Sequence, residues 1–270
     1  MALDLILEAS RTEAATLAWS WATDPGAVRA LNEDAVVAEA PVFLVADGVG
    51  GQEAGEIASG LVATRFRSLV ADGPVPADAV AEELRIANDM LRDAARPMGT
   101  TAVGMVVVEH RGVTCWLVLN VGDSRAYCWA DGRLVQLTRD HSHVQDLVDA
   151  GELDAEAARH HPDRNVITRA LGAADEVAPD FWVRPIRAGE RYLLCSDGLS
   201  GEVDDALLAE VLGIGLTPDE TVDSLVHHAL RAGGRDNVSA IVIDVLRAAD
   251  DAPVTTRRRA GTWSTPAEGP

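Results

Sequence analysis

The chain alternates between two hydrophobic periods, one typical of strands and one typical of helices. Short apolar runs bounded by turn-forming residues predict buried strands. They lie at Leu17–Ala22, Val42–Ala46, Thr101–Val108, Val113–Val121, Ala126–Trp129, Phe181–Val183, Tyr192–Cys195 and Val238–Val245. Apolar positions three and four residues apart predict helices over about Glu53–Val70, Ala77–Ala95, Val144–Ala150, Asp205–Leu212 and Asp219–Ala232.

The order of these segments indicates the class of fold. Consecutive strands between residues 101 and 137 are joined by short turns, which favours antiparallel pairing over alternating β-α-β units. Asp131-Gly132, for example, is a common hairpin turn and connects Ala126–Trp129 to a further strand at Arg133–Leu137. We expect an α+β fold in which sheets pack together and helices lie outside.

One domain accounts for most of the chain. Residues 1–15 are interpreted as a short helical N-terminal extension, and residues 16–247 contain no linker and no internal repeat. Residues 248–270 are rich in Pro, Gly, Thr, Ala and Arg, which indicates a disordered C-terminal tail.

Charge and composition exclude several function classes. The 270 residues include 43 acids and 23 bases, for a formal net charge of −20. All the bases are arginine, so a phosphate-loop lysine, a kinase lysine and a Schiff-base lysine are ruled out. The acidic excess also argues against nucleic acid as a partner, because phosphate backbones are bound by clustered cations.

No segment indicates a membrane or an oxidising compartment. No run approaches the roughly 18 apolar residues of a membrane span. The first 20 residues lack the apolar centre of a signal peptide, so we expect a cytoplasmic protein without membrane contact. Cys115, Cys128 and Cys195 occur singly in apolar runs and are interpreted as buried thiols.

Acidic residues stand at the ends of several apolar strands. Asp47 follows Val42–Ala46, Asp123 and Asp197 follow two later strands, and Asp236 precedes the last one. Asp-Gly is also a hairpin turn, but Asp47 and Asp197 are followed by helices rather than by returning strands. Carboxylates that converge on one rim repel one another unless cations lie between them. We therefore predict a site for divalent cations.

The donor type favours Mg²⁺ or Mn²⁺. All candidate ligands are oxygen atoms, and His141 and His143, which have no adjacent third ligand, are interpreted as solvated or structurally bonded. The run Gly48-Val49-Gly50-Gly51 invites comparison with dinucleotide-binding loops. However, Glu53 occupies the place of their last glycine, and Asp47 would repel pyrophosphate. We interpret these glycines as allowing the backbone to approach a metal closely.

The segment Arg29-Ala30-Leu31-Asn32-Glu33-Asp34 supplies one cation and two further acids. By itself it is typical of an exposed charged turn. Beside a metal cluster, an arginine fork fits a pair of phosphate oxygens, and the acids can bind metal or hold its waters.

Six motifs follow one another along the chain. They are Arg29-x-x-Asn32-Glu33-Asp34, Asp47-Gly48-x-Gly50-Gly51, Gly99-Thr100-Thr101, Gly122-Asp123-Ser124-Arg125, Ser196-Asp197-Gly198-Leu199 and Asp236-Asn237. In this order they resemble the motifs of the metal-dependent Ser/Thr protein phosphatases, the type 2C or PPM family. The resemblance spans residues 16–247, and His161 to Gly172 resembles the flap of the bacterial branch. It implies a β-sandwich of two antiparallel sheets flanked by helices on both sides.

The resemblance also implies a set of metal ligands for two core ions, Mn²⁺ or Mg²⁺, and for a third, weaker ion. Asp47 is implied to bridge the two core cations. The remaining implied ligands are the Gly48 carbonyl and Glu33 for one core cation, Asp197 and Asp236 for the other, and Asp123 for the third, which has Asn165 as a neighbour.

Arg29 and Asp34 are the implied catalytic residues. Arg29 is implied to bind the substrate phosphate, and Asp34 to orient a water that bridges the two cations and attacks phosphoserine or phosphothreonine. Val49 stands where many eukaryotic members carry a histidine, a candidate general acid, so we expect modest turnover on alkyl phosphoesters. The implied partners are phosphoproteins such as Ser/Thr kinases and their targets, and a monomer is expected. The alternative function is a catalytically weak or inactive phosphoprotein-binding regulatory module.

Overall fold

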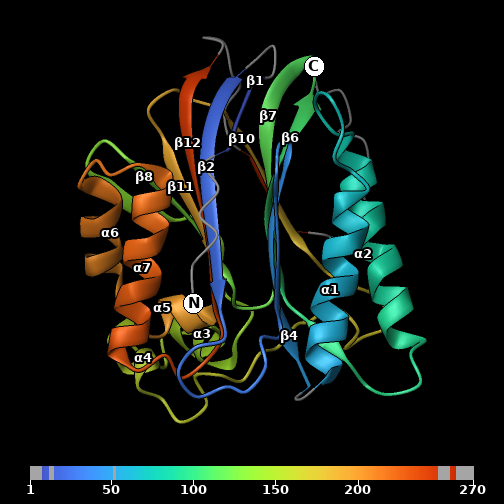
Figure 1. The fold of residues 1–270 in the computed structure, drawn as a ribbon. Coiled ribbons are helices and arrows are strands. Elements are labelled where there is room, and N and C mark those ends of the chain that lie inside the picture. The colour runs from blue at the N-terminus through green and yellow to red at the C-terminus, as the bar shows by residue number, and fades with distance from the viewer. Residues whose placement is uncertain (1–7, 12–14, 51–52, 249–255, 260–270) are drawn as a thin grey trace.

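Two antiparallel sheets form the centre of the molecule, which we describe from a computed structural model (Figure 1). The structure describes residues 8–11, 15–50, 53–248 and 256–259. One sheet has the strand order β1-β2-β12-β11-β8-β9, and the other has the order β13-β10-β7-β6-β4-β3, with β5 paired to β4. The strands are β1 (Glu8–Arg11), β2 (Ala15–Asp24), β3 (Asp34–Glu39), β4 (Val42–Val49), β5 (Gly99–Thr100), β6 (Ala102–His110), β7 (Val113–Val121), β8 (Arg125–Ala130), β9 (Arg133–Gln136), β10 (Asp180–Pro185), β11 (Arg191–Cys195), β12 (Val238–Ala248) and β13 (Thr256–Arg259).

The apolar strands are buried on both faces. In β4, Phe43 and Val45 join the core between the two sheets, whereas Val42, Leu44 and Ala46 join the core beneath the helices. Successive side chains of a strand point to opposite faces, so a continuous apolar run fits a strand covered on both sides. This explains why runs such as Val42–Ala46 could be recognised as strands from sequence.

Aromatic side chains fill the space between the sheets. Trp19 from one sheet packs edge-on against Phe43 from the other at 5.3 Å between ring centroids. Phe43 contacts Trp116, which in turn contacts Tyr192 across the sandwich. Edge-to-face pairs of this kind are favourable beyond the area they bury, and they bind the two sheets to each other.

Helices cover both outer faces and give an α-β-β-α layered molecule (Figure 1). α1 and α2 pack on the β4–β6 side, and α5, α6 and α7 pack on the β11–β12 side. The helices are α1 (Glu53–Arg67), α2 (Ala77–Arg92), α3 (His143–Asp149), α4 (Ala155–Arg159), α5 (Asp197–Ser200), α6 (Asp205–Gly213) and α7 (Pro218–Ala232). The predicted fold class is therefore confirmed. Within the described ranges, no helix has both the length and the apolar character needed to cross a bilayer.

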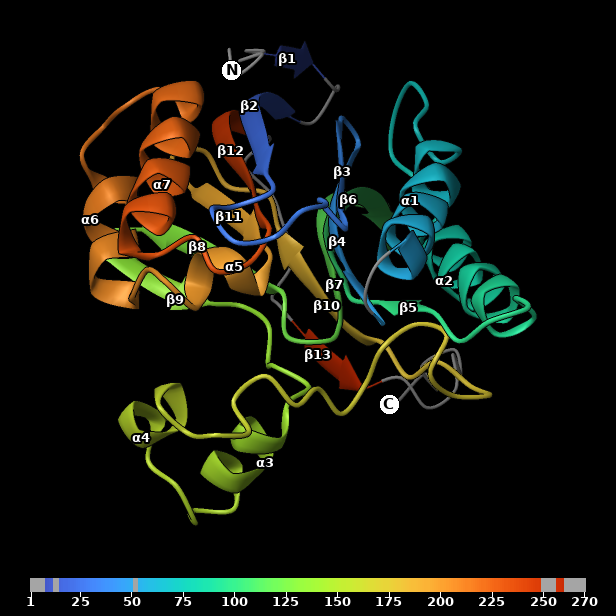
Figure 2. The same cartoon turned by 60° about the horizontal axis from the view of Figure 1, so that its bottom comes forward.

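α3 and α4 lie apart from the sandwich, in the connection between β9 and β10 (Figure 2). We call the segment of residues 139–179 the flap. Its α3 begins at Ser142, whose side chain accepts a hydrogen bond from the backbone of Gln145. α4 begins in the same way at Asp154.

Three strand segments depart from the sequence predictions. The helix predicted for residues 1–15 is wrong over Glu8–Arg11, which pair with β2, and over Ala15, which begins β2. Thr256–Arg259, in the predicted disordered tail, pair with β10. Both pairings supply hydrogen-bond partners to backbone N–H and C=O groups that an edge strand would leave unpaired.

Asp34–Glu39 form β3, although Asp34 was expected in a charged turn. Residues 1–7, 12–14, 249–255 and 260–270 lie outside the described residues.

Candidate metal centre

Acidic residues from distant parts of the chain meet at one end of the sandwich, the lower end in Figure 1, where α5 lies. Asp34 and Asp47 are opposite each other in the β3–β4 register. Asp197 is the first residue of α5, directly after β11, and Asp236 lies two residues before β12. Asp123 follows β7 and is buried. The predicted convergence of these acids is therefore a feature of the fold.

Asp34 is held by neutral hydroxyl groups. Its Oδ2 accepts hydrogen bonds from Ser196 Oγ at 2.9 Å and from Ser239 Oγ at 2.6 Å. Its Oδ1 is buried and has no hydrogen-bond partner in the described part of the chain. A buried carboxylate oxygen without a partner is costly, so Oδ1 is open to a water or to another polar group.

Glu33 is positioned by its backbone. The Glu33 amide donates to Asn237 Oδ1 at 2.8 Å, and the Glu33 carbonyl accepts from the Gly48 amide at 3.1 Å. Glu33 Oε1 is also buried without a hydrogen-bond partner among the described residues. A Cβ at Gly55 would lie 2.6 Å from this oxygen, so any other residue there would displace the Glu33 carboxylate.

Gly48 lies in the same crowded corner. A Cβ on Gly48 would lie 2.3 Å from the Gly55 carbonyl oxygen and 2.6 Å from that of Glu33. The predicted approach of the Gly48 backbone to a metal stays a prediction. What it approaches is the Glu33 loop and the start of α1, both of which lie beside the acids.

Arg29 and Asp236 form an ion pair with 2.6 Å between Nη2 and Oδ2. Both side chains are partly exposed, at 47% and 36%. The hydrogen bond that Arg29 donates to Asp236 is the main reason that the pKa of Arg29 is raised. Within the described residues no three His, Cys, Asp or Glu side chains are arranged to hold one ion, and Asp236 is turned toward Arg29 instead.

Burial and mutual repulsion raise the pKa values of these acids. Burial is the main cause for each, and it raises the pKa of Asp34 to about 7. The pKa values of Asp47 and Asp123 are raised well above the ordinary range, and nearby carboxylates add to the effect of burial. The pKa values of Asp197 and Glu33 are also raised. Carboxyl groups that raise one another's pKa values are suited to binding divalent cations, because a bound cation neutralises their negative charge and takes carboxylate oxygens as ligands. The oxygen donors of these residues therefore match hard divalent cations in chemistry, although no three of the described acidic side chains are gathered around one position in this structure.

Asp123 lies in a turn that several neighbours hold. Gly122 has φ 109°, and a Cβ there would lie 2.5 Å from Cγ2 of Thr101. The Gly122 amide donates to Nδ1 of buried His141 at 3.1 Å, and Asn120 Nδ2 donates to the Gly122 carbonyl at 3.0 Å. His141 is therefore structurally bonded, in agreement with its interpretation from sequence.

A groove with a volume of about 1040 Å³ opens beside Asp123 and Asp197 and extends along the flap. Asn165 of the flap lines this groove together with Asp123. Asn165 and Asp123 thus share one groove, and the place of Asn165 beside the third cation stays a prediction.

Sequence reasoning did not assign roles to several supporting residues. Thr101 Oγ1 accepts from the Asp47 amide at 3.0 Å, and the Thr101 amide donates to the Asp47 carbonyl at 2.8 Å. Asn237 Nδ2 donates to the carbonyls of Pro25 and Leu31 and so ties the Arg29–Glu33 loop to β12. With Ser196 and Ser239, these residues orient the acids without adding charge. All of these residues except Ser239 belong to the motifs recognised in the sequence, and their place in a motif is the signal that could have identified them.

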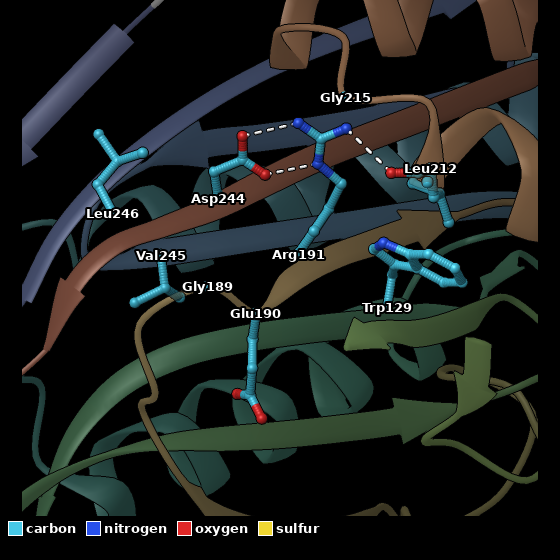
Figure 3. A pocket seen from close by; sticks show the side chains of 10 residues that line it. Trp129, Gly189, Glu190, Arg191, Leu212, Gly215, Asp244, Val245 and Leu246 are labelled. Carbon is cyan, nitrogen blue, oxygen red and sulfur yellow. Dashed lines mark hydrogen bonds and ion pairs between the residues drawn. The ribbon is translucent and has the colours of Figure 1, made fainter. Parts of the chain in front are cut away.

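A second cavity, of about 260 Å³, lies at the other end of β11 and β12 (Figure 3). Arg191 on its wall donates to both carboxylate oxygens of Asp244, to the carbonyls of Leu212 and Leu216, and to Thr221. These five hydrogen bonds use all the N–H groups of the guanidinium. Arg191 therefore has a structural role, and the cavity is separate from the acids.

The buried-thiol prediction is confirmed. Cys115, Cys128 and Cys195 are all free and buried. Burial raises the pKa of each thiol, to about 11 for Cys128 and about 12 for Cys195. Groups of this kind are unreactive packing residues.

Comparison with known proteins places the chain in a family. The sequence model of the family Protein phosphatase 2C matches residues 27–147. The serine/threonine protein phosphatase PstP of Mycobacterium tuberculosis is 41% identical over 240 residues, which cover 83% of this chain and 44% of PstP. The chain thus spans less than half the length of that relative. The serine/threonine phosphatase stp of Listeria innocua is 34% identical over 243 residues, which cover 82% of this chain and 93% of stp.

Solved structures agree with these sequence relatives. The crystal structure of M. tuberculosis PstP/Ppp has a TM-score of 0.79 at 39% identity and covers 86% of this chain and 99% of its own. The catalytic domain of PstP in complex with two manganese ions has a TM-score of 0.76 at 39% identity, with the same coverage of both chains. From its layered fold, its cluster of buried acids and these similarities, the chain belongs to the protein phosphatase 2C, or PPM, family.

Proposed function

We propose that this chain is a metal-dependent protein phosphatase that hydrolyses phosphoserine and phosphothreonine in proteins. The observation that carries the proposal is the set of buried acids at one end of the sandwich, whose pKa values are raised by burial and by one another. The names of the relatives support the same reaction, since PstP and stp are both serine/threonine phosphatases.

The acids would hold two core cations, Mn²⁺ or Mg²⁺, and a weaker third one. Asp47 would contact both core cations. The other ligands proposed are the Gly48 carbonyl and Glu33 for one cation, Asp197 and Asp236 for the other, and Asp123 for the third. When bound, such cations lower the pKa of water and neutralise phosphoryl charge. The two manganese ions of the PstP catalytic domain support this assignment.

Asp34 and Arg29 supply the other groups the reaction needs. Because Ser196 and Ser239 occupy Oδ2 of Asp34, its free Oδ1 can accept a proton from the attacking water and orient that water. Arg29 is partly exposed and can turn from Asp236 to the phosphate, whose oxygens match the guanidinium fork.

Val49 supplies no proton for the leaving alkoxide, so that proton must come from water or from another group. A positioned general acid contributes about 10²–10⁴-fold where the leaving group needs one. Turnover on alkyl phosphoesters should accordingly be modest, whereas aryl phosphates, which have better leaving groups, should suffer less.

The competing function is a phosphoprotein-binding module without useful catalysis. The presence of every acid of the motifs argues against it. The test is hydrolysis of p-nitrophenyl phosphate and of a phosphothreonine peptide with Mn²⁺, with EDTA as the control. We expect release of product that requires the metal. A flat time course with Mn²⁺ present would favour the binding module.

We further propose that the protein acts as a monomer in the cytoplasm on phosphoproteins, including Ser/Thr kinases and their targets. Three free thiols suit a reducing compartment. Exposed large apolar side chains are spread over separate elements, among them Ile57 of α1, Met90 of α2 and Val135 of β9, which supports a monomer. Light scattering at several concentrations would test the oligomeric state.

A further inference from the structure

The groove beside Asp123 and Asp197 has two walls of different charge. Residues of the flap line one side of the groove, and the segment that leads from α5 into α6 lines the other. Figure 2 shows where the flap helices α3 and α4 and the helices α5 and α6 lie. Because two of the proposed metal ligands open into the groove, the residues next to a bound phosphoserine or phosphothreonine would lie along these walls. The charge of the walls can therefore select among phosphoproteins, an inference that rests on the proposed function.

The acids of the second wall are held by contacts within the protein. Glu202, whose side chain is 7% exposed, pairs with Arg235 at 3.2 Å. Asp204 accepts from the Leu207 amide at the start of α6, and Asp205 accepts from the hydroxyl of Tyr127. Both aspartates also lie where the helix dipole favours negative charge. Glu202 is therefore neutralised by an ion pair, whereas Asp204 and Asp205 have structural partners and keep their charge.

Arg125, a half-buried cation that lines the groove, is neutralised by an ion pair. Arg125 is bound by both carboxylate oxygens of Asp140, with a shortest distance of 2.7 Å. In the flap, Arg139 is paired with Asp146 at 2.7 Å and with Asp149 at 2.5 Å. Arginines of this region thus tend to be neutralised by acids nearby.

Two flap arginines that line the groove differ from this pattern. Arg159, at the end of α4, is half-buried, and Arg164 is exposed. Neither has an ion pair or a side-chain hydrogen bond in the described ranges of this chain. The acids nearest to them in sequence are Glu156, which lies 3.5 Å from His160, and exposed Asp163, which directly precedes Arg164 but forms no ion pair with it in the described residues. The protein has a net charge of −20. The two unpaired guanidinium groups therefore make this side of the groove locally positive in a protein that is negatively charged overall.

We propose that Arg159 and Arg164 select phosphoproteins that carry aspartate or glutamate next to the phosphorylated residue. Guanidinium groups bind carboxylates through charge-assisted hydrogen bonds. Exposed pairs of this kind are individually weak, so the pair of arginines should favour an acidic peptide by about 3- to 10-fold in kcat/KM. The preference should decrease at high salt because solvent-exposed charges are screened.

The test compares three phosphothreonine peptides of equal length, flanked by Asp/Glu, by Asn/Gln or by Arg, with Mn²⁺ present. The wild-type protein should hydrolyse the acidic peptide with the highest kcat/KM. The double variant Arg159→Gln/Arg164→Gln should lose this preference and keep its kcat/KM for the Asn/Gln peptide and for p-nitrophenyl phosphate. Arg187→Gln, at an exposed arginine between β10 and β11, is the matched control and should retain the preference.

Charge reversal provides a second variant. Arg159→Glu/Arg164→Glu should shift the preference to the arginine-flanked peptide, and an unchanged melting temperature would show that each variant is folded. Equal hydrolysis of the three peptides by the wild-type protein, or a preference that survives the double variant, would overturn the role of the two arginines and leave the phosphatase function standing. Failure to hydrolyse any substrate with Mn²⁺ would instead overturn the proposed function together with this inference.

Discussion

Neutral side chains orient the acidic residues of the candidate metal centre. Ser196 and Ser239 hold Asp34, Thr101 holds the backbone of Asp47, and Asn237 holds the backbone of Glu33. Because these partners carry no charge, they set the positions of the acids and leave their negative charge uncompensated. At the residue scale, the site is prepared for cations that the side chains themselves do not supply.

Asp47→Asn should reduce kcat by about 10³-fold or more. The substitution keeps the size of the side chain and removes the charge that both core cations would share. The measurement is turnover of p-nitrophenyl phosphate at saturating Mn²⁺. Asp72→Asn, in an exposed turn, should behave like the wild type. A variant at position 47 with activity within tenfold of the wild type would refute the bridging role.

Arg29→Ala should mainly weaken phosphate binding. A charge-assisted contact to phosphate is worth about 1.5–3 kcal/mol, so KM for a phosphopeptide should rise by roughly 10- to 100-fold with a smaller change in kcat. Steady-state kinetics would separate the two constants. Since Arg29 also pairs with Asp236, the Mn²⁺ dependence should be measured beside them. An unchanged KM would contradict phosphate binding by Arg29.

At the scale of elements, the first residues of the flap, before α3, bond the flap to the turn that carries Asp123. The His141 amide donates to the Gly122 carbonyl, and its carbonyl accepts from the Thr168 amide of the flap. The His141 ring accepts from the Gly122 amide through Nδ1, while Nε2 lies 3.6 Å from Oδ2 of Asp180. Movement of the flap is thereby linked to the turn that carries Asp123.

His141→Leu should destabilise the protein by about 1–3 kcal/mol, because it leaves the buried Gly122 amide without an acceptor. His141→Asn offers an amide oxygen near the position of Nδ1 and should cost less. Urea unfolding of the two variants beside the wild type measures the difference. Equal stabilities for the Leu and Asn variants would show that the Gly122 contact is unimportant.

At the scale of the whole molecule, the sandwich separates two kinds of polar group. One end gathers buried acids with raised pKa values, and the other contains Arg191, which is fully bonded within the protein. Repulsion among the acids therefore weakens the folded state whenever they ionise without cations.

The stability of the metal-free protein should fall as the pH rises. Burial raises the pKa of Asp34 from 3.8 to about 7, so between these values the folded state binds more protons than the unfolded state. The stability that protonated Asp34 contributes to the folded state is then fully present at a pH near 3.8, and it is lost as the pH rises toward about 7. In EDTA, the melting temperature should be higher at pH 5 than at pH 8.

Mn²⁺ should remove this dependence, because bound cations neutralise the ionised acids. Asp34→Asn should also flatten the slope measured in EDTA. Thermal unfolding at several pH values, with and without Mn²⁺, measures both effects. A melting temperature in EDTA that increases over the same interval would show that these acids do not repel one another in the folded state.

Local patterns in the sequence determined much of the fold. Val42–Ala46 and Val238–Val245 could be predicted as strands because a run buried on both faces is mostly apolar. Asp131-Gly132 could be predicted as a hairpin turn because both residues adopt positive φ there, at 51° and 74°. Strands with weaker patterns could not be predicted: Asp34–Glu39 is short and begins with an acid, and it is defined by its pairing with β4.

The positions of the acids at strand ends, together with the resemblance to a phosphatase family, were sufficient to nominate the site residues. Only the tertiary structure decided how they meet. Ser239 reaches Asp34 across 205 residues of chain, and Arg29 reaches Asp236 across 207. The physical reason is that hydrophobic periodicity records which face of an element is buried, whereas the distance between two charges depends on how separate elements pack.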